Sequence, residues 1–80
     1  MDVRNIANVI ASTLAEDFPG EDIPEGHLYV PFMAYGLDPF QAAVGVLVGA
    51  GLLERRPGPC LRTTKRLLDV VAGLKAKASA

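Results

Sequence analysis

The sequence predicts a mainly α-helical domain with one small β-hairpin. Apolar residues recur at helical spacing near both ends of the chain, and residues 42–53 form an unbroken apolar run. Short strand-like segments flank a Pro-Gly-Pro connection at residues 57–59. Eighty residues fit a single domain. We therefore expect one domain over residues 1–80, with a three-helix core, a hairpin and a C-terminal helix.

An amphipathic helix is expected near the N-terminus. Asp2 is placed to cap it, and Pro19-Gly20 ends it. An acidic loop at residues 19–24 is then expected before the next helix. The predicted apolar stripe consists of Val3, Ile6, Val9, Ile10, Leu14 and Phe18.

Residues 25–37 leave two interpretations open, because Pro31 disturbs a helix interior but suits a first turn. The preferred one is a kinked helix over residues 26–35, closed by Gly36 in a left-handed conformation. The alternative is a turn followed by a short helix from about Val30. The bulky side chains of the segment either pack in the core, which is preferred, or form an aromatic patch for a partner. They are Tyr29, Phe32 and Tyr35.

The third helix has clear start and stop signals. Asp38 is expected at its N-cap, Pro39 at N1 and Gln41 at N3 in a variant capping box, and Gly51 ends it. One side should face the core, and the opposite side is small and smooth: Gln41, Ala42, Gly45 and Gly49. Glycine in a helix costs about 0.5–1 kcal/mol relative to alanine, so two glycines suggest a close helix neighbour. Packing within the chain is the preferred interpretation, and a partner interface is the alternative.

The hairpin is expected to join strands at residues 53–56 and 60–63. Thr64 is then placed to cap the last helix. The expected core stripe of that helix is Leu67, Leu68, Val70, Val71 and Leu74.

The segment AVGVLVGAGLLERRPGPCLRTTKRLL, from Ala43 onward, resembles winged-helix transcription regulators. In that family the third helix ends in a Gly-Leu corner, and a basic two-stranded wing and a Thr-capped helix follow. The resemblance covers about half the chain, and the first two helices fit by order alone. It implies a winged-helix fold with a DNA-reading helix at residues 38–50. The phosphate contacts that it implies come from the wing and the helix behind it: Arg55, Arg56, Arg62, Lys65 and Arg66.

The reading helix departs from the family pattern. Base edges in the major groove are read mainly by Arg, Lys, Asn or Gln side chains, and the only one here is Gln41. Asp38 would also repel phosphate, so sequence-specific reading is not expected. The sequence therefore favours a non-catalytic interaction module that self-associates or docks with a protein partner. The alternative is a DNA-binding regulator or accessory that grips phosphates through its wing.

The net charge of −1 is the sum of an acidic first half and a basic second half. Residues 1–40 carry one arginine against seven carboxylates, which gives −6. Residues 41–80 carry seven basic side chains against two acidic ones, which gives +5. Either these halves face each other within the fold or are simply solvated, or they steer a charged partner or dock head-to-tail with a second copy.

Catalytic chemistry is not expected. His27 and Cys60 are the only histidine and the only cysteine, and they lie far apart in the sequence. No phosphate-binding loop or metal-ligand spacing occurs, so neither a cofactor nor a small-molecule substrate is predicted. The twelve-residue apolar run is too short to cross a bilayer, and the N-terminus lacks a signal-peptide pattern. A cytoplasmic protein without a membrane partner is expected.

Overall fold

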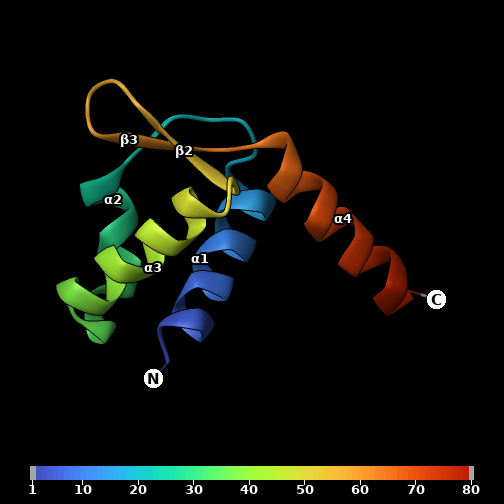
Figure 1. Ribbon diagram of the computed structural model, residues 1–80, viewed down its shortest axis with the longest axis horizontal. Helices are drawn as coiled ribbons and strands as arrows, with labels where there is room; N and C mark the ends of the chain where they lie inside the picture. The colour runs from blue at the N-terminus through green and yellow to red at the C-terminus, as the bar shows by residue number, and fades with distance from the viewer. Residues whose placement is uncertain (1, 80) are drawn as a thin grey trace.

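The computed structural model describes residues 2–79, which form a mainly helical fold with a small antiparallel sheet (Figure 1). The sheet has three strands in the order β1-β3-β2. In chain order the elements are α1 (Val3–Asp17), β1 (Ile23–Pro24), α2 (Glu25–Tyr29), the 3-10 helix η1 (Val30–Tyr35), α3 (Leu37–Gly49), β2 (Leu53–Arg56), β3 (Cys60–Thr63) and α4 (Lys65–Ser79). The mainly α prediction is correct, and one strand is additional to it.

The first helix begins as the sequence predicts. The Asp2 carboxylate accepts a hydrogen bond from the backbone N–H of Arg4, at 3.2 Å, and caps α1. Small side chains on both helices, Ala7 and Ala11 of α1 and Ala43 of α3, are buried in the core. Because alanine occupies little space, these positions let the backbones of α1 and α3 pack closely.

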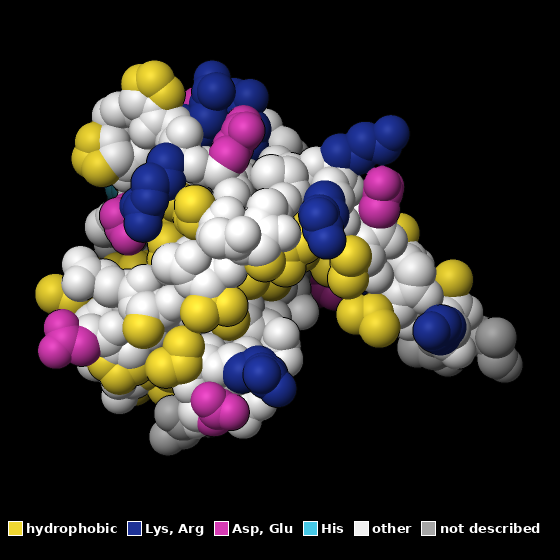
Figure 2. All heavy atoms as spheres, in the orientation of Figure 1, with side chains coloured by type: hydrophobic (Ala, Val, Ile, Leu, Met, Phe, Trp, Pro, Cys, Tyr) yellow, Lys and Arg dark blue, Asp and Glu magenta, His cyan; other side chains and the backbone are white. Residues whose placement is uncertain are grey.

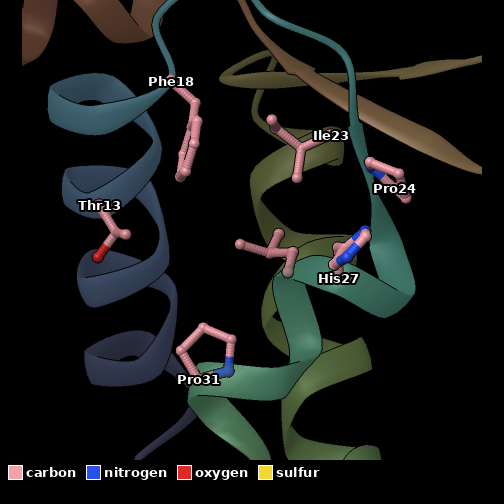
Figure 3. A pocket seen from close by; sticks show the side chains of 7 residues that line it. Thr13, Phe18, Ile23, Pro24, His27 and Pro31 are labelled. Atoms are coloured by element: carbon pink, nitrogen blue, oxygen red, sulfur yellow. The ribbon is translucent and has the colours of Figure 1, made fainter.

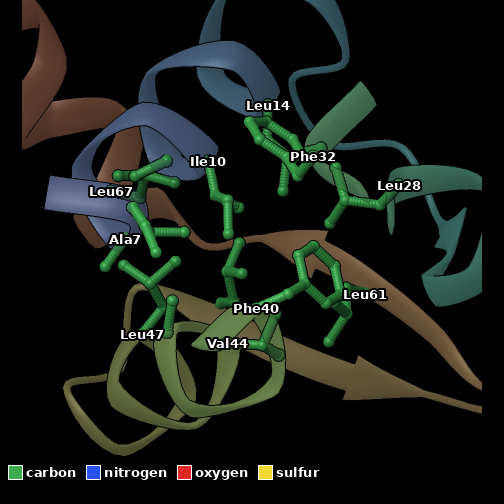
Figure 4. Close-up of a cluster of buried hydrophobic side chains, with 14 residues drawn as sticks. Ala7, Ile10, Leu14, Leu28, Phe32, Phe40, Val44, Leu47, Leu61 and Leu67 are labelled. Atoms are coloured by element: carbon green, nitrogen blue, oxygen red, sulfur yellow. The ribbon is translucent and has the colours of Figure 1, made fainter. Parts of the chain in front are cut away.

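Phe40 of α3 lies in the middle of the core and is only 1% exposed (Figure 4). Its ring centroid lies 5.0 Å from that of Tyr29 and 6.2 Å from that of Phe32, within the usual range for aromatic pairs. The core thus joins α2 and η1 to α3, and α1, α4 and the sheet supply its other walls. The aliphatic members that surround these rings include Ile6, Ile10, Leu14, Leu28, Val44, Leu47, Leu53, Leu61 and Leu67.

Residues 25–35 are helical throughout, which agrees with the preferred interpretation of a kinked helix. The change from α to 3-10 geometry falls at Val30, next to Pro31, whose nitrogen carries no hydrogen. The predicted left-handed cap is wrong in detail. Gly36 has φ 92° and ψ 154°, so its φ is positive but its ψ is extended, and it leads directly into α3.

The predicted N-cap of α3 is also wrong. Gly36 occupies that position without a side-chain hydrogen bond, and Asp38 lies inside the first turn. The carboxylate still stands near the positive end of the helix dipole. The end of the helix is correct. Gly51 has φ 77°, the N–H of Gly51 donates to the Val48 carbonyl at 3.1 Å, and that of Leu52 donates to Leu47 at 2.9 Å. These two bonds form a Schellman motif.

The hairpin has the predicted bounds, and Gly58 provides the positive φ, 76°, that its turn requires. The prediction of a loop over residues 19–24 is wrong at its C-terminal end, because Ile23–Pro24 forms β1. This strand pairs with β3, with Ile23 opposite Leu61. The sheet therefore ties the chain between α1 and α2 to the hairpin.

The last helix begins as predicted, because the Thr64 hydroxyl accepts a hydrogen bond from the N–H of Leu67 at 3.3 Å. Its predicted core stripe is only partly correct. Leu67 is buried and Leu68 and Val71 are half-buried, but Val70 is 48% exposed and Leu74 is 61% exposed. Beyond its first turns α4 projects away from α3 and the sheet (Figure 1), and beside α1 it borders an open groove, so Val70 and Leu74 remain exposed.

Candidate functional site

The arginines of the hairpin lie against acidic side chains, most of them from the other half of the chain. Asp22 Oδ1 accepts a hydrogen bond from Arg62 Nε at 2.6 Å and lies 3.6 Å from Arg56 Nε. Arg55 Nη1 lies 4.0 Å from Glu25 Oε2. Within the hairpin, Arg56 Nη1 lies 3.8 Å from Glu54 Oε1. Each of the three arginines of the predicted phosphate-contacting wing therefore has a carboxylate neighbour.

This pairing changes the electrostatics of the wing. Three guanidinium groups stand beside three carboxylates, so the formal charge of the cluster is zero. The oppositely charged halves of the chain face each other here, and again where Lys75 Nζ lies 3.5 Å from Glu16 Oε1. Of the predicted phosphate-contacting residues, Lys65 and Arg66 remain exposed and form no ion pair with another described residue.

The predicted helix–helix interface lies open on the surface. We define the α3 face as Gln41, Ala42, Gly45, Val46 and Gly49, which are all exposed. A Cβ atom added at Gly45 or Gly49 would meet nothing within 4 Å. The preferred interpretation, that these glycines pack against another helix of the same chain, is therefore wrong. Buried alanines bring α1 and α3 together instead.

The α3 face carries no charge. Asp38 is the only charged residue of α3, and it lies in the first turn. Val46 is 54% exposed and gives the face an apolar side chain. Figure 2 shows backbone and small hydrophobic groups over α3, with lysine, arginine and carboxylate side chains around this region rather than within it. A smooth uncharged surface suits contact with another protein better than contact with phosphates.

The aromatic residues do not form a surface patch. Phe32 is 4% exposed, and Tyr29 and Tyr35 are half-buried. Phe32 and Tyr35 stack on each other with ring centroids 6.3 Å apart. These side chains contribute to the core, as the preferred interpretation has it.

An apolar pocket lies between the end of α1 and α2, with a volume of about 340 Å³. Figure 3 shows Thr13 of α1 and Phe18, which follows that helix, on one side and Ile23, Pro24 and His27 on the other. His27 is the only titratable side chain that lines it, and Thr13 supplies the only hydroxyl. The pocket thus offers an apolar surface but no carboxylate or thiol to work with the imidazole.

A second apolar groove, of about 300 Å³, runs between α1 and α4 and includes the exposed Val70 and Leu74.

The Cys60 thiol forms its hydrogen bond within the hairpin turn, where its Sγ donates to the Gly58 carbonyl at 3.0 Å. Among residues 2–79 no group of three metal-ligating side chains comes together. Within the same range, no helix is long and apolar enough to cross a membrane.

Comparisons of this chain with protein-family models, with curated proteins and with solved structures find no match. The two surfaces that differ most from an ordinary exposed helix or hairpin are the neutralised wing and the uncharged α3 face.

Proposed function

We propose that this chain is a winged-helix-like interaction module, without catalytic activity, that acts through protein–protein contacts of the α3 face. The observation that carries the proposal is the open, uncharged surface around Gly45 and Gly49. Two glycines cost helix stability, about 0.5–1 kcal/mol each, and nothing within the chain uses the space that they leave. A partner that approaches the helix closely would use it.

The order of the elements supports the winged-helix part of the proposal. A helix that ends in a Gly51-Leu52 corner is followed by a two-stranded hairpin and then by a helix that Thr64 caps. This order agrees with the resemblance found in the sequence. The fold itself hosts many functions, so the contact surface and not the architecture carries the functional argument.

Site-directed photo-crosslinking tests the proposal in the source cell. A benzophenone amino acid at Ala42, in the α3 face, is expected to form covalent adducts with protein. The same probe at Glu21, which is exposed on the loop before β1, serves as the control and should form few adducts. Equal labelling from both positions, or no adducts from Ala42, would contradict the proposed docking role.

The alternative of a phosphate-gripping wing loses support from the ion pairs of Asp22 and Glu25. We expect the wild-type chain to bind generic duplex DNA weakly even at about 50 mM salt, because its arginines already have carboxylate partners. The double substitution Asp22→Asn with Glu25→Gln removes two negative charges and should strengthen binding. Since each newly available phosphate contact adds about 0.9 to the slope of log K against log salt, the salt dependence should also steepen.

Fluorescence anisotropy with labelled duplex DNA at about 50 mM and about 200 mM salt measures both effects. Glu21→Gln with Asp17→Asn is the matched control, because it removes the same charge from exposed residues that form no ion pair with another described residue. Tight, salt-sensitive binding by the wild-type chain would show that the ion pairs do not restrain the wing, and would favour the DNA-binding alternative.

A further inference from the structure

We propose that the α3 face binds a second copy of this chain, with the two α3 helices antiparallel about a twofold axis near Gly45. This inference rests on the proposed function and specifies the partner. It differs from docking to another protein because it predicts which residues of the two copies meet.

The register of α3 supports this arrangement. Asp38, Ala42, Gly45 and Gly49 follow one another at intervals of four, three and four residues, so they share one side of the helix. The buried residues Phe40, Val44 and Leu47 lie on the opposite side. The acidic Asp38 therefore marks the N-terminal end of the same line of residues that carries the two open glycines.

A basic side chain lies beside the C-terminal end of α3. Arg66, in the first turn of α4, lies against the end of α3, since its Cδ is 3.9 Å from the position a Cβ of Gly51 would occupy. Arg66 and Asp38 are both exposed, and neither forms an ion pair with another described residue. The α3 helix thus has an acidic side chain in its first turn, an uncharged exposed face in its middle and a basic side chain beside its C-terminal end.

Two copies of such a surface are complementary in charge when their α3 helices run antiparallel. Asp38 and Gly51 lie at nearly equal distances along the chain from Gly45, so an antiparallel pair centred there places Asp38 of each copy near Arg66 of the other. A twofold contact forms each interaction twice. The glycines of the two helices then meet at the centre, where the absence of side chains permits close approach. Parallel helices would instead bring like charges together at both ends.

Charge reversal and mixing test this register directly. Asp38→Arg alone places two arginines together at each end of the pair, and Arg66→Asp alone places two carboxylates together. Each variant should therefore self-associate at least roughly tenfold more weakly than the wild type. When the two variants are mixed in equal amounts, every contact again joins opposite charges, so the mixture should recover dimers that neither variant forms alone.

Sedimentation equilibrium over a wide concentration range measures these constants, and circular dichroism verifies that each variant is folded. Lys77→Asp and Asp17→Arg are matched reversals at exposed positions away from the α3 face and should leave dimerisation unchanged. A second pair of variants tests the centre of the contact. Gly45→Leu should weaken the dimer, whereas Gly73→Leu, at a similarly open glycine of α4, should not.

Recovery of dimers on mixing, together with weakening by Gly45→Leu alone, supports the inference. A wild-type chain that stays monomeric at about 1 mM, or a mixture that associates no better than its components, overturns it. Failure here is distinguishable from failure of the proposed function. If Ala42 crosslinks only to a different protein, docking stands and the second copy is excluded; if it forms no adduct and the chain is monomeric, both fall.

Discussion

Phe40→Ala is expected to lower the free energy of unfolding by about 3–5 kcal/mol, enough to leave much of the chain unfolded. Phe40 is 1% exposed, and its ring contacts those of Tyr29 and Phe32. Removing it leaves a cavity where α2 and η1 meet α3, and it breaks the aromatic packing that holds these elements together. A chain of eighty residues has few other core contacts to compensate.

Urea denaturation followed by far-ultraviolet circular dichroism measures the change. Phe18→Ala is the matched control, since Phe18 is 40% exposed and its loss should cost much less. Equal effects of the two substitutions would show that Phe40 does not hold the central position that its burial indicates.

Thr64→Ala should lower the free energy of unfolding by about 1–2 kcal/mol. The Thr64 hydroxyl lies 2.7 Å from the Gly51 carbonyl and 3.1 Å from that of Leu52, and it accepts from the N–H of Leu67. One oxygen thus connects the end of α3, the approach to β2 and the first turn of α4. Alanine would leave the Leu67 N–H and these carbonyls without that partner.

The conservative variant Thr64→Ser separates the contribution of the hydroxyl to stability from that of the methyl group, because it keeps the hydroxyl and loses only the methyl group. It should retain most of the stability in urea denaturation. Native-state hydrogen exchange at the Leu67 amide should be faster in the alanine variant than in the serine variant. Equal destabilisation by both substitutions would mean that the methyl group, and not the hydrogen bonds, accounts for the effect.

Local signals in the sequence account for the elements that were predicted well. Asp2 and Thr64 cap the helices that follow them, and Gly51 ends α3, because caps depend on backbone geometry over a few residues. The hairpin was located to the residue by Pro57-Gly58-Pro59. The error at Asp38 is of the same local kind: Gly36 can adopt a positive φ, so α3 starts two residues earlier than the proline signal suggests.

Interactions between distant parts of the chain were not predictable in the same way. Strand β1 has two residues and no alternation of its own, and it exists because Ile23 pairs with Leu61, 38 positions later. The ion pair between Asp22 and Arg62 depends on that pairing, so the arginines appear available for phosphate when the sequence is read alone. Conversely, the apolar stripe of α4 follows helical spacing, but beyond Leu67 it borders an open groove against α1, so Val70 and Leu74 stay exposed.

The charges around the wing also bear on how the molecule avoids aggregation. In the strand order β1-β3-β2, β1 and β2 are the edge strands. Each has one row of backbone N–H and C=O groups that does not pair with another strand of the sheet. Such rows attract strands from other molecules. Here β1 is two residues long and ends in Pro24, and β2 carries Glu54, Arg55 and Arg56 in succession. Short length, proline and dense charge all discourage the addition of a foreign strand. Arg55 and Arg56, two of the arginines that resemble a phosphate grip, thus discourage strand addition at the β2 edge of the sheet, whether or not the molecule ever meets DNA.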